Sequence, residues 1–214
     1  MGHILNGRLS DDWKHLLSAL NLTGASPFGT VTSDPGRCVL KAGSSVFKIV
    51  RREASTTQQQ RAQTLAGEAI ILKRLSGIPG IPKALSCRRM RDADILELSF
   101  FDGRRWSDLP RNAASDVATL GRLFLILVRC SWRGVAHNDL RAENVLVGAQ
   151  GSCFLVDFDQ ATICSRARAF LANFFGIGFK EGATKVALGK LLIERLLPAP
   201  AVSGLRRLKL KADR

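Results

Sequence analysis

The sequence predicts an α+β protein built from two lobes, and three observations support this fold class. Strand-like segments with one helix among them fill the first half of the chain, whereas helix-like segments dominate the second half. Of the 214 residues, 46% are hydrophobic and 23% are charged, a balance typical of globular proteins with a substantial core. The stretch "FFDGRRW", residues 100–106, separates the two patterns. We therefore expect an N-lobe over residues 1–101 and a C-lobe over residues 102–214.

The expected N-lobe begins with a short amphipathic helix and continues as an antiparallel sheet. The helix is predicted over residues 9–22, where Ser10 is the N-cap and acidic residues occupy the first turn. Segments rich in β-branched and aromatic residues predict five strands. These strands are "FGTVTS" at 28–33, "CVLKAG" at 38–43, "SVFKIV" at 45–50, "ALSCRRM" at 84–90 and "DILELSFF" at 94–101. Residues 57–77 have the leucine spacing of a helix that ends at Gly77.

The expected C-lobe is helical apart from short strands near "NVLV", residues 144–147, and "CFLVDF", residues 153–158. Residues 113–132 are long and largely apolar, which predicts a helix at the centre of the lobe. Basic and aromatic residues alternate in "RARAFLANFFGIGF", and we expect its phenylalanines, at positions 170, 174, 175 and 179, to pack in the core. A further helix, "ATKVALGKLLIERLL", precedes the basic end "LRRLKLKADR".

Charge and cysteine content narrow the class of protein. The net charge of +14 predicts attraction to phosphate-rich partners, which include nucleotides, nucleic acids and anionic membrane surfaces. Five cysteines without a C-x-x-C pair favour reduced thiols over a disulfide framework or a zinc site. The longest apolar run, "LFLILV", is too short to cross a bilayer. We therefore expect a cytoplasmic protein, or one peripheral at the inner face of a membrane, with no transmembrane segment.

The stretch "GVAHNDLRAENVLV", residues 134–147, places many polar groups between an apolar helix and an apolar strand. Asp139 and Asn144 lie in this loop, and Asp157 follows at the end of the strand "CFLVDF". One carboxylate can orient a hydroxyl group, while the asparagine and the second aspartate can hold Mg²⁺ against a triphosphate. This combination indicates phosphoryl transfer.

The order of these residues resembles the protein kinase motifs H-R-D-L-x-x-x-N and D-F-G. From about Gly24 to Ala161 the chain is similar to the protein kinase-like superfamily, and its short length and "H-N-D-L" loop look most like RIO-type and lipopolysaccharide-kinase-type bacterial kinases. The resemblance implies a two-lobe protein kinase-like fold with a five-stranded N-lobe and a shortened helical C-lobe. It also implies ATP and Mg²⁺ as cofactors.

The resemblance assigns roles to the matching residues. Asp139 would be the catalytic base and Arg141 a helper at the transferred phosphate, while His137 would brace the loop. Lys48, in "VFKIV", would bind the α and β phosphates and pair with Glu68 on the following helix. The remaining implied residues are Asn144 and Asp157 as Mg²⁺ ligands, Gly24, Ser26 and Gly29 in a glycine-rich loop, and Glu97 and Phe100 in a hinge at the adenine.

The chain also departs from the kinase pattern. Asn138 replaces the arginine of H-R-D, so we expect no switching by phosphorylation of an activation loop. Asp159 replaces the glycine of D-F-G, the residue type that most easily takes a positive φ. No A-P-E motif follows, and residues 158–214 leave little room for the helices that grip peptide substrates. Substrate recognition would then use residues 166–179, the helix at 183–197 or the basic end.

The sequence therefore predicts an ATP- and Mg²⁺-dependent phosphotransferase with an alcohol group as acceptor, and first of all an atypical serine/threonine protein kinase. A sugar-hydroxyl kinase is the alternative, because a basic surface suits an anionic glycolipid such as lipopolysaccharide core. A nucleotide-binding pseudokinase scaffold is a further alternative. Nucleic-acid association through the basic surface stays open and is not favoured. The basic end is equally well a solvated terminus or a docking element for an anionic partner.

Overall fold

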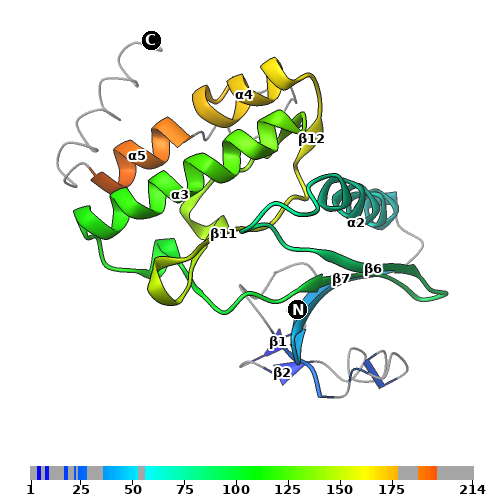
Figure 1. Ribbon diagram of the computed structural model, residues 1–214. Coiled ribbons are helices and arrows are strands. Elements are labelled where there is room, and N and C mark those ends of the chain that lie inside the picture. Colours follow the sequence, from blue (N-terminus) through cyan, green and yellow to red (C-terminus); the bar gives the residue numbers. More distant parts are fainter. Residues whose placement is uncertain are drawn as a thin grey trace, which may run out of the picture. The chain divides into compact units, whose positions relative to one another are not determined.

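The chain forms a mixed α/β structure with antiparallel sheets (Figure 1). The computed structural model describes residues 4–5, 8–9, 17–18, 22, 24–27, 36–52, 56–177 and 188–196. Two compact units divide the chain, one within residues 1–73 and 82–101 and the other within residues 74–81 and 102–214. The described helices are α2 (Thr56–Arg74), α3 (Ala113–Trp132), α4 (Arg166–Phe175) and α5 (Leu188–Leu196).

The strands of the first unit are β1 (Ile4–Leu5), β2 (Arg8–Leu9), β3 (Ser26–Pro27), β4 (Arg37–Ala42), β5 (Ser45–Arg51), β6 (Ala84–Arg89) and β7 (Ala93–Ser99). Those of the second unit are β8 (Arg104–Arg105), β9 (Val135–Ala136), β10 (Val145–Val147), β11 (Cys153–Leu155) and β12 (Thr162–Ile163).

The first unit is built on a sheet with the strand order β3-β4-β5-β7-β6, in which every neighbouring pair is antiparallel. Strand β5 is central, and its residues from Val46 to Val50 are all buried. Four of the strands coincide with segments that the sequence predicts. The expected strand at residues 28–33 lies outside the described residues, and β3 is the edge strand beside β4. Of the expected helix at residues 9–22, the description covers Leu17, Ser18 and Leu22, and the first two are helical.

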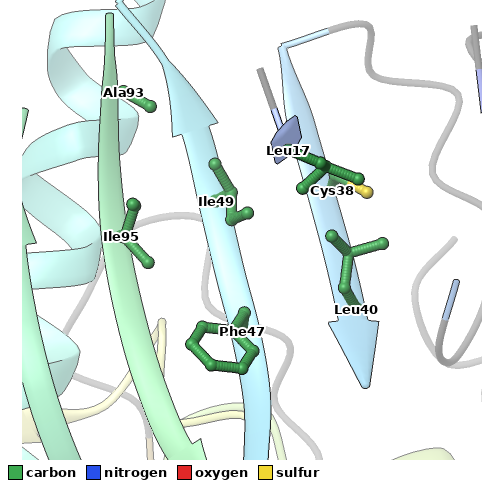
Figure 2. Close-up of a cluster of buried hydrophobic side chains, with 7 residues drawn as sticks. All are labelled: Leu17, Cys38, Leu40, Phe47, Ile49, Ala93 and Ile95. Carbon is green, nitrogen blue, oxygen red and sulfur yellow. The ribbon is translucent and has the colours of Figure 1, made fainter. Parts of the chain in front are cut away.

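One face of this sheet carries a compact hydrophobic cluster (Figure 2). Ile49 of β5 lies opposite Cys38 of β4 and Ile95 of β7, and Phe47 lies opposite Leu40. Leu17 and Ala93 complete the cluster. Because side chains alternate along a strand, the same register directs Lys48 of β5 to the other face of the sheet. Burial of each large aliphatic side chain contributes about 1.5–3 kcal/mol and thereby fixes the strand that carries Lys48.

Helix α2 carries a buried stripe that contains one carboxylate. Leu65, Glu68 and Leu72 are buried and lie three and four residues apart, which places them on a single helix face. A carboxylate among leucines is costly unless a cation and hydrogen bonds compensate it. The partner of Glu68 is therefore a structural requirement as well as a functional candidate.

The second unit is organised around α3, beside which α4 and α5 lie (Figure 1). The predicted helix over residues 113–132 is confirmed, since α3 has these bounds. Its N-cap is Asn112, whose side chain accepts a hydrogen bond from the Ser115 N–H at 3.2 Å. Two small antiparallel sheets complete the unit, one in the order β11-β10-β8 and the other pairing β12 with β9.

A buried polar cluster joins α5 to the start of α3. Asp116 Oδ1 accepts hydrogen bonds from Trp106 Nε1 at 2.7 Å and from Arg195 Nη2 at 2.8 Å. The Arg195 guanidinium also lies 5.0 Å from the centre of the Trp106 ring. All three residues are buried, so the charges of Asp116 and Arg195 depend on each other. The helix at 183–197, expected as a substrate-recognition candidate, thus contributes at least one residue to the core.

Residues 74–81 begin at the last residue of α2 and belong to the second unit. Gly80 has φ +84°, and a Cβ atom built there would lie 2.7 Å from the Cys153 carbonyl oxygen and 2.7 Å from Ile126 Cδ1. The Gly80 carbonyl accepts a hydrogen bond from the Leu155 N–H at 2.8 Å. The position therefore requires glycine, both for its backbone conformation and for its close approach to β11.

The five cysteines are all free thiols. Three are buried, and burial raises the pKa of Cys38 to about 11 and the pKa values of Cys130 and Cys153 to about 12. Such thiols are poor nucleophiles near neutral pH. Among the described helices, none combines the length and the apolar character needed to cross a membrane.

We predict that Arg195→Met lowers the free energy of unfolding by about 3–5 kcal/mol, because the Asp116 carboxylate stays buried without its cation. Lys190→Met on the same helix is the matched control. Lys190 forms a partly exposed pair with Glu194 at 3.8 Å, and its loss should cost less than about 1 kcal/mol. Urea unfolding of the three proteins measures both values. Equal losses in the two variants would show that Arg195 acts as an ordinary surface charge.

Candidate functional site

The buried lysine and glutamate of the first unit form a close ion pair. Lys48 Nζ donates to Glu68 Oε1 at 2.8 Å and to Oε2 at 2.9 Å. Both side chains are buried, so the pair compensates the carboxylate in the α2 stripe. The contact fixes the end of the Lys48 side chain relative to the sheet. A lysine held in this way presents a positive charge of defined position, as a phosphate-binding site requires.

The predicted hinge segment is tied into the sheet by its own polar groups. Glu97 accepts hydrogen bonds from Ser45 Oγ at 3.0 Å and from Ser86 Oγ at 2.9 Å. The Phe100 N–H donates to the Ser44 carbonyl at 2.9 Å, and Lys41 Nζ lies 3.8 Å from the centre of the Phe100 ring. An adenine at this segment would have to use groups other than the Glu97 carboxylate and the Phe100 N–H.

The predicted glycine-rich loop is described in part. Gly24 is exposed in a turn, and nothing lies within 4 Å of a Cβ atom built there. Ser26 belongs to β3, where it pairs with Lys41 of β4. Gly29 lies outside the described residues.

In the second unit, His137 is the buried centre of the polar loop. Its backbone N–H donates to Asn173 Oδ1 at 2.9 Å, and its Nδ1 accepts from the Asp139 N–H at 3.3 Å. Because Nδ1 is an acceptor, the proton is on Nε2, which donates to the Val156 carbonyl at 3.1 Å. Burial lowers the pKa of His137, although the Val156 carbonyl and three nearby carboxylates, those of Asp139, Asp157 and Asp159, raise it in part. The ring is therefore neutral at neutral pH.

The Asp139 carboxylate is oriented by two donors from its own loop. Arg141 Nη2 donates to Asp139 Oδ2 at 2.9 Å, and Asn144 Nδ2 donates to the same oxygen at 3.0 Å. Asp139 and Asn144 are buried, whereas 46% of the Arg141 side chain is exposed. The structure thus brings together three residues that the sequence predicts as parts of one site.

The amide group of Asn144 is fixed in one orientation, because its nitrogen is hydrogen-bonded to Asp139. Nδ2 donates to the Asp139 carbonyl at 2.8 Å as well as to Oδ2, which uses both of its protons. No hydrogen bond to Asn144 Oδ1 occurs among the described residues. That oxygen is consequently available as a ligand, and the amide cannot flip without losing both donations.

Strand pairing brings the residue before Asp157 beside Asn144. Val145 of β10 lies opposite Leu155 of β11, and the Val156 N–H donates to the Asn144 carbonyl at 2.9 Å. Asp157 is the next residue along the chain. No group of three or more His, Cys, Asp or Glu side chains suited to a metal ion occurs in the part of the chain that the structure describes. An asparagine and an aspartate nevertheless fit Mg²⁺, which keeps several water or phosphate ligands in such sites.

Two residues of this region have a left-handed backbone. Asn138 has φ 62° and Asp157 has φ 65°, a region that Asn and Asp enter more readily than most residues. Asn138 Nδ2 donates to the Gln160 carbonyl at 3.0 Å and to Thr162 Oγ1 at 3.0 Å. In place of the kinase arginine, Asn138 therefore fastens the loop directly to the segment after Asp157. Asp159, where the sequence suggests a loss of backbone freedom, is not among the positive-φ residues of the described chain.

Asn173 of α4 is a supporting residue that the sequence reasoning missed. It receives the His137 N–H and donates to Ser131 Oγ at 2.9 Å and to the Val135 carbonyl at 3.0 Å. It thereby joins α3, β9 and the loop. The signal in the sequence was a lone asparagine in register with Ala169 and Ala172, which are both buried.

The expected core packing of the phenylalanines of α4 was wrong for two of them. Phe174 is buried and its ring lies 5.2 Å from that of Phe124, whereas Phe170 and Phe175 are exposed. Phe179 lies outside the described residues. Small residues of α4, with Ala136 of β9, form the buried cluster instead, because the helix backbone approaches β9 closely.

We predict that acid destabilises the fold through His137. Its pKa is lowered in the folded state, so below the unfolded value of about 6.5 the unfolded chain binds more protons and the free energy of unfolding falls. His137→Gln retains a donor for the Val156 carbonyl and cannot be protonated, so it should flatten this decrease. Urea unfolding on both sides of pH 6.5 measures the slope. An unchanged slope in the variant would assign the acid sensitivity to other groups.

Comparisons with known proteins bear on the fold. No protein-family model and no curated protein matches this chain. A crystal structure of monomeric WbdD is similar, with a TM-score of 0.55 and 19% identity over 80% of this chain and 40% of that chain. A co-crystal structure of WbdD with a kinase inhibitor has a TM-score of 0.50 and 18% identity, over 63% of this chain and 35% of that chain.

This chain therefore spans less than half the length of the WbdD chains that it resembles. At 18% and 19% identity the likeness concerns the fold and carries no activity with it. The fold of this chain is kinase-like.

Proposed function

We propose that this chain is an ATP- and Mg²⁺-dependent phosphotransferase that transfers the γ-phosphate to a hydroxyl group. The observation that carries the proposal is the arrangement of the loop, in which Arg141 and Asn144 donate to one oxygen of Asp139. The kinase-like fold and the Lys48–Glu68 pair support it. We also propose that, among kinases, this chain is most similar to the RIO-type and lipopolysaccharide-kinase-type enzymes.

Asp139 is the proposed catalytic base. In phosphoryl transfer a carboxylate accepts a hydrogen bond from the attacking hydroxyl and takes its proton, while positioning supplies most of the rate. The two donors at Oδ2 fix the carboxylate plane before an acceptor binds. Arg141 is the proposed source of positive charge beside the transferred group. Because it is half exposed, it can exchange its bond to Asp139 for one to a phosphate oxygen.

Other residues are proposed to bind the nucleotide and the metal ion. Lys48, positioned by Glu68, is proposed to bind the α and β phosphates. Asn144 Oδ1 and the Asp157 carboxylate are proposed to hold Mg²⁺, for which oxygen ligands are preferred. When bound with ATP, Mg²⁺ supplies positive charge that neutralises the phosphate oxygens. The residues proposed to line the nucleotide are Gly24, Ser26, Gly29, Glu97 and Phe100.

The acceptor is first proposed to be a serine or threonine of a protein. One observation favours a sugar hydroxyl as the second candidate. Helix α4 begins at Arg166, so the segment between Asp157 and this helix is confined to residues 158–165 and includes β12. Protein kinases bind peptides along a longer activation segment, whereas a small hydroxyl acceptor needs none.

We predict that Mg·ATP stabilises the protein more than ATP with EDTA does, because a ligand that binds only the folded state raises its stability. Asp157→Asn should remove most of this difference. Asparagine tolerates a positive φ as aspartate does, so the backbone at φ 65° is retained while the metal ligand is weakened. Thermal unfolding in the two buffers measures the shift.

Asp159→Asn is the matched control, because it removes a carboxylate two residues away that has no assigned role. It should keep the Mg²⁺-dependent shift. A wild-type protein with equal shifts in both buffers would refute the metal assignment, as would equal losses in the two variants.

We predict that Asp139→Asn lowers phosphoryl transfer roughly 10²- to 10⁴-fold with little change in Mg·ATP affinity. The variant keeps the size of the side chain and an oxygen for the Arg141 and Asn144 donors, but loses the base. Glu143→Gln is the matched control, since it removes an exposed carboxylate of the same loop and should leave transfer unchanged. Labelled ATP is supplied with a mixture of generic proteins in one reaction and with lipopolysaccharide in another.

The distribution of label separates the acceptor classes. Label on protein supports the serine/threonine assignment, and label on lipopolysaccharide supports the sugar-hydroxyl assignment. If the wild type binds Mg·ATP but labels neither acceptor, itself included, and Asp139→Asn behaves identically, a nucleotide-binding scaffold replaces the kinase.

A further inference from the structure

The outer face of α3 is an exposed apolar stripe. Val117, Leu125 and Trp132 have 55%, 54% and 66% of their surface exposed. Phe124 is 44% exposed, and both Phe124 and Leu125 lie seven or eight residues from Val117 and from Trp132, about two helical turns, which places the four residues on one side of the helix. From Val117 to Trp132 the stripe is roughly 22 Å long at the helical rise. Such a run of large apolar side chains on a surface indicates an interaction site.

Arginines gather at the Trp132 end of this stripe. Arg166 of α4 lies with its guanidinium carbon 4.5 Å from the centre of the Trp132 ring. Arg74 Nε donates to the Arg133 carbonyl at 2.6 Å, and Arg133 Nη1 donates to the Arg74 carbonyl at 3.3 Å. The two cationic side chains are thus held near each other by main-chain acceptors, although their charges repel.

These four arginines form no ion pair with a carboxylate of the described residues. The four are Arg74, Arg133, Arg166 and the exposed Arg129 of α3, and none of them appears in an ion pair within the described parts of the chain. A groove of about 460 Å³ lies beside them and is lined by Ile78, Pro79, Val128, Arg129, Trp132 and Arg133. Clustered guanidinium groups without carboxylates are suited to phosphate, which each can bind through two parallel hydrogen bonds.

We propose that this face, termed the α3 face and comprising the stripe with these four arginines, docks onto an anionic lipid surface. Apolar side chains of an interfacial helix enter the acyl boundary, while arginines beside them reach the lipid phosphates. Tryptophan favours the boundary between these two layers, and Trp132 lies at the arginine end of the stripe with Arg166 over its ring. The net charge of +14 adds long-range attraction to the same surface.

An anionic bilayer fits the observations better than an acidic protein does. The stripe is a convex helix face, and a fluid bilayer accommodates it without a complementary shape. A protein partner would have to match both the convex stripe and the groove beside it. The inference is independent of phosphoryl transfer, since it uses no residue assigned to the reaction.

The test measures co-sedimentation of the full chain with vesicles of phosphatidylcholine alone and of phosphatidylcholine mixed with phosphatidylglycerol. We expect binding to the mixed vesicles that weakens as salt is added. Two double variants test whether the α3 face makes the contact. Leu125→Ser with Trp132→Ser removes the apolar contact, and Arg129→Glu with Arg166→Glu reverses two exposed charges that form no ion pair in the described chain. Each should reduce the vesicle affinity about ten-fold or more.

Controls come from the first unit. Leu85→Ser removes an exposed leucine of β6, and Arg88→Glu with Arg91→Glu changes the net charge by the same amount as the charge-reversal variant. Both should bind nearly as the wild type does. The proposal is overturned if the wild type binds no vesicles, if it binds both compositions equally, or if the control variants lose as much affinity. Binding of polyglutamate through Trp132 without vesicle binding would assign the α3 face to an acidic protein instead.

Discussion

The burial of a neutral His137 is the constraint on which the second unit depends. Its main-chain N–H, its Nδ1 and its Nε2 each have a partner, and these partners lie on α4, in the loop itself and just after β11. A buried imidazole is tolerated only when its polar atoms are satisfied, so the three elements must meet at one point. Once they meet, Asp139 follows two residues later with its N–H already bound to the ring. The main chain that carries this carboxylate is held by one of the hydrogen bonds that satisfy the buried imidazole.

Local patterns predicted much of the fold, whereas long-range polar contacts were not predictable. The β-branched and aromatic residues of β5, the leucine spacing of α2 and the long apolar run of α3 are properties of contiguous residues, so these elements could be found from the sequence. The pairing of Lys48 with Glu68 could be expected from the kinase-like order of motifs. By contrast, Asn173 meets His137 across 36 positions and Arg195 meets Asp116 across 79. The helix and strand periodicities of the sequence do not predict contacts between residues so far apart. The prediction that the phenylalanines of α4 are buried failed for Phe170 and Phe175 for a related reason. The close approach of α4 to β9, a long-range contact, leaves room only for small residues between them.

The departures from the kinase motifs acquire a physical meaning in the structure. Asparagine at position 138 is compatible with a left-handed backbone, and its amide binds the chain beyond Asp157 through neutral groups. A phosphate-binding arginine would instead need a modified residue as its partner. The loop and the segment after it are thus joined by residues that the sequence itself provides. Asp157 also has a left-handed backbone, and aspartate, like asparagine, adopts this conformation at comparatively little cost.

The packing of Gly80 against β11 makes each unit discontinuous along the chain. Residues 74–81 are synthesised well before Cys153 and Leu155, yet they belong with them, and the hairpin β6–β7 that follows returns to the first unit. A fragment that begins at Asp102 would leave the Leu155 N–H and the Arg133 carbonyl without the partners that residues 74–81 supply. A fragment that ends at Phe101 would expose Ile78 and Ile81. On the ribosome, residues 74–81 emerge long before β11, so this part of the second unit waits for its partners while the first unit can already fold.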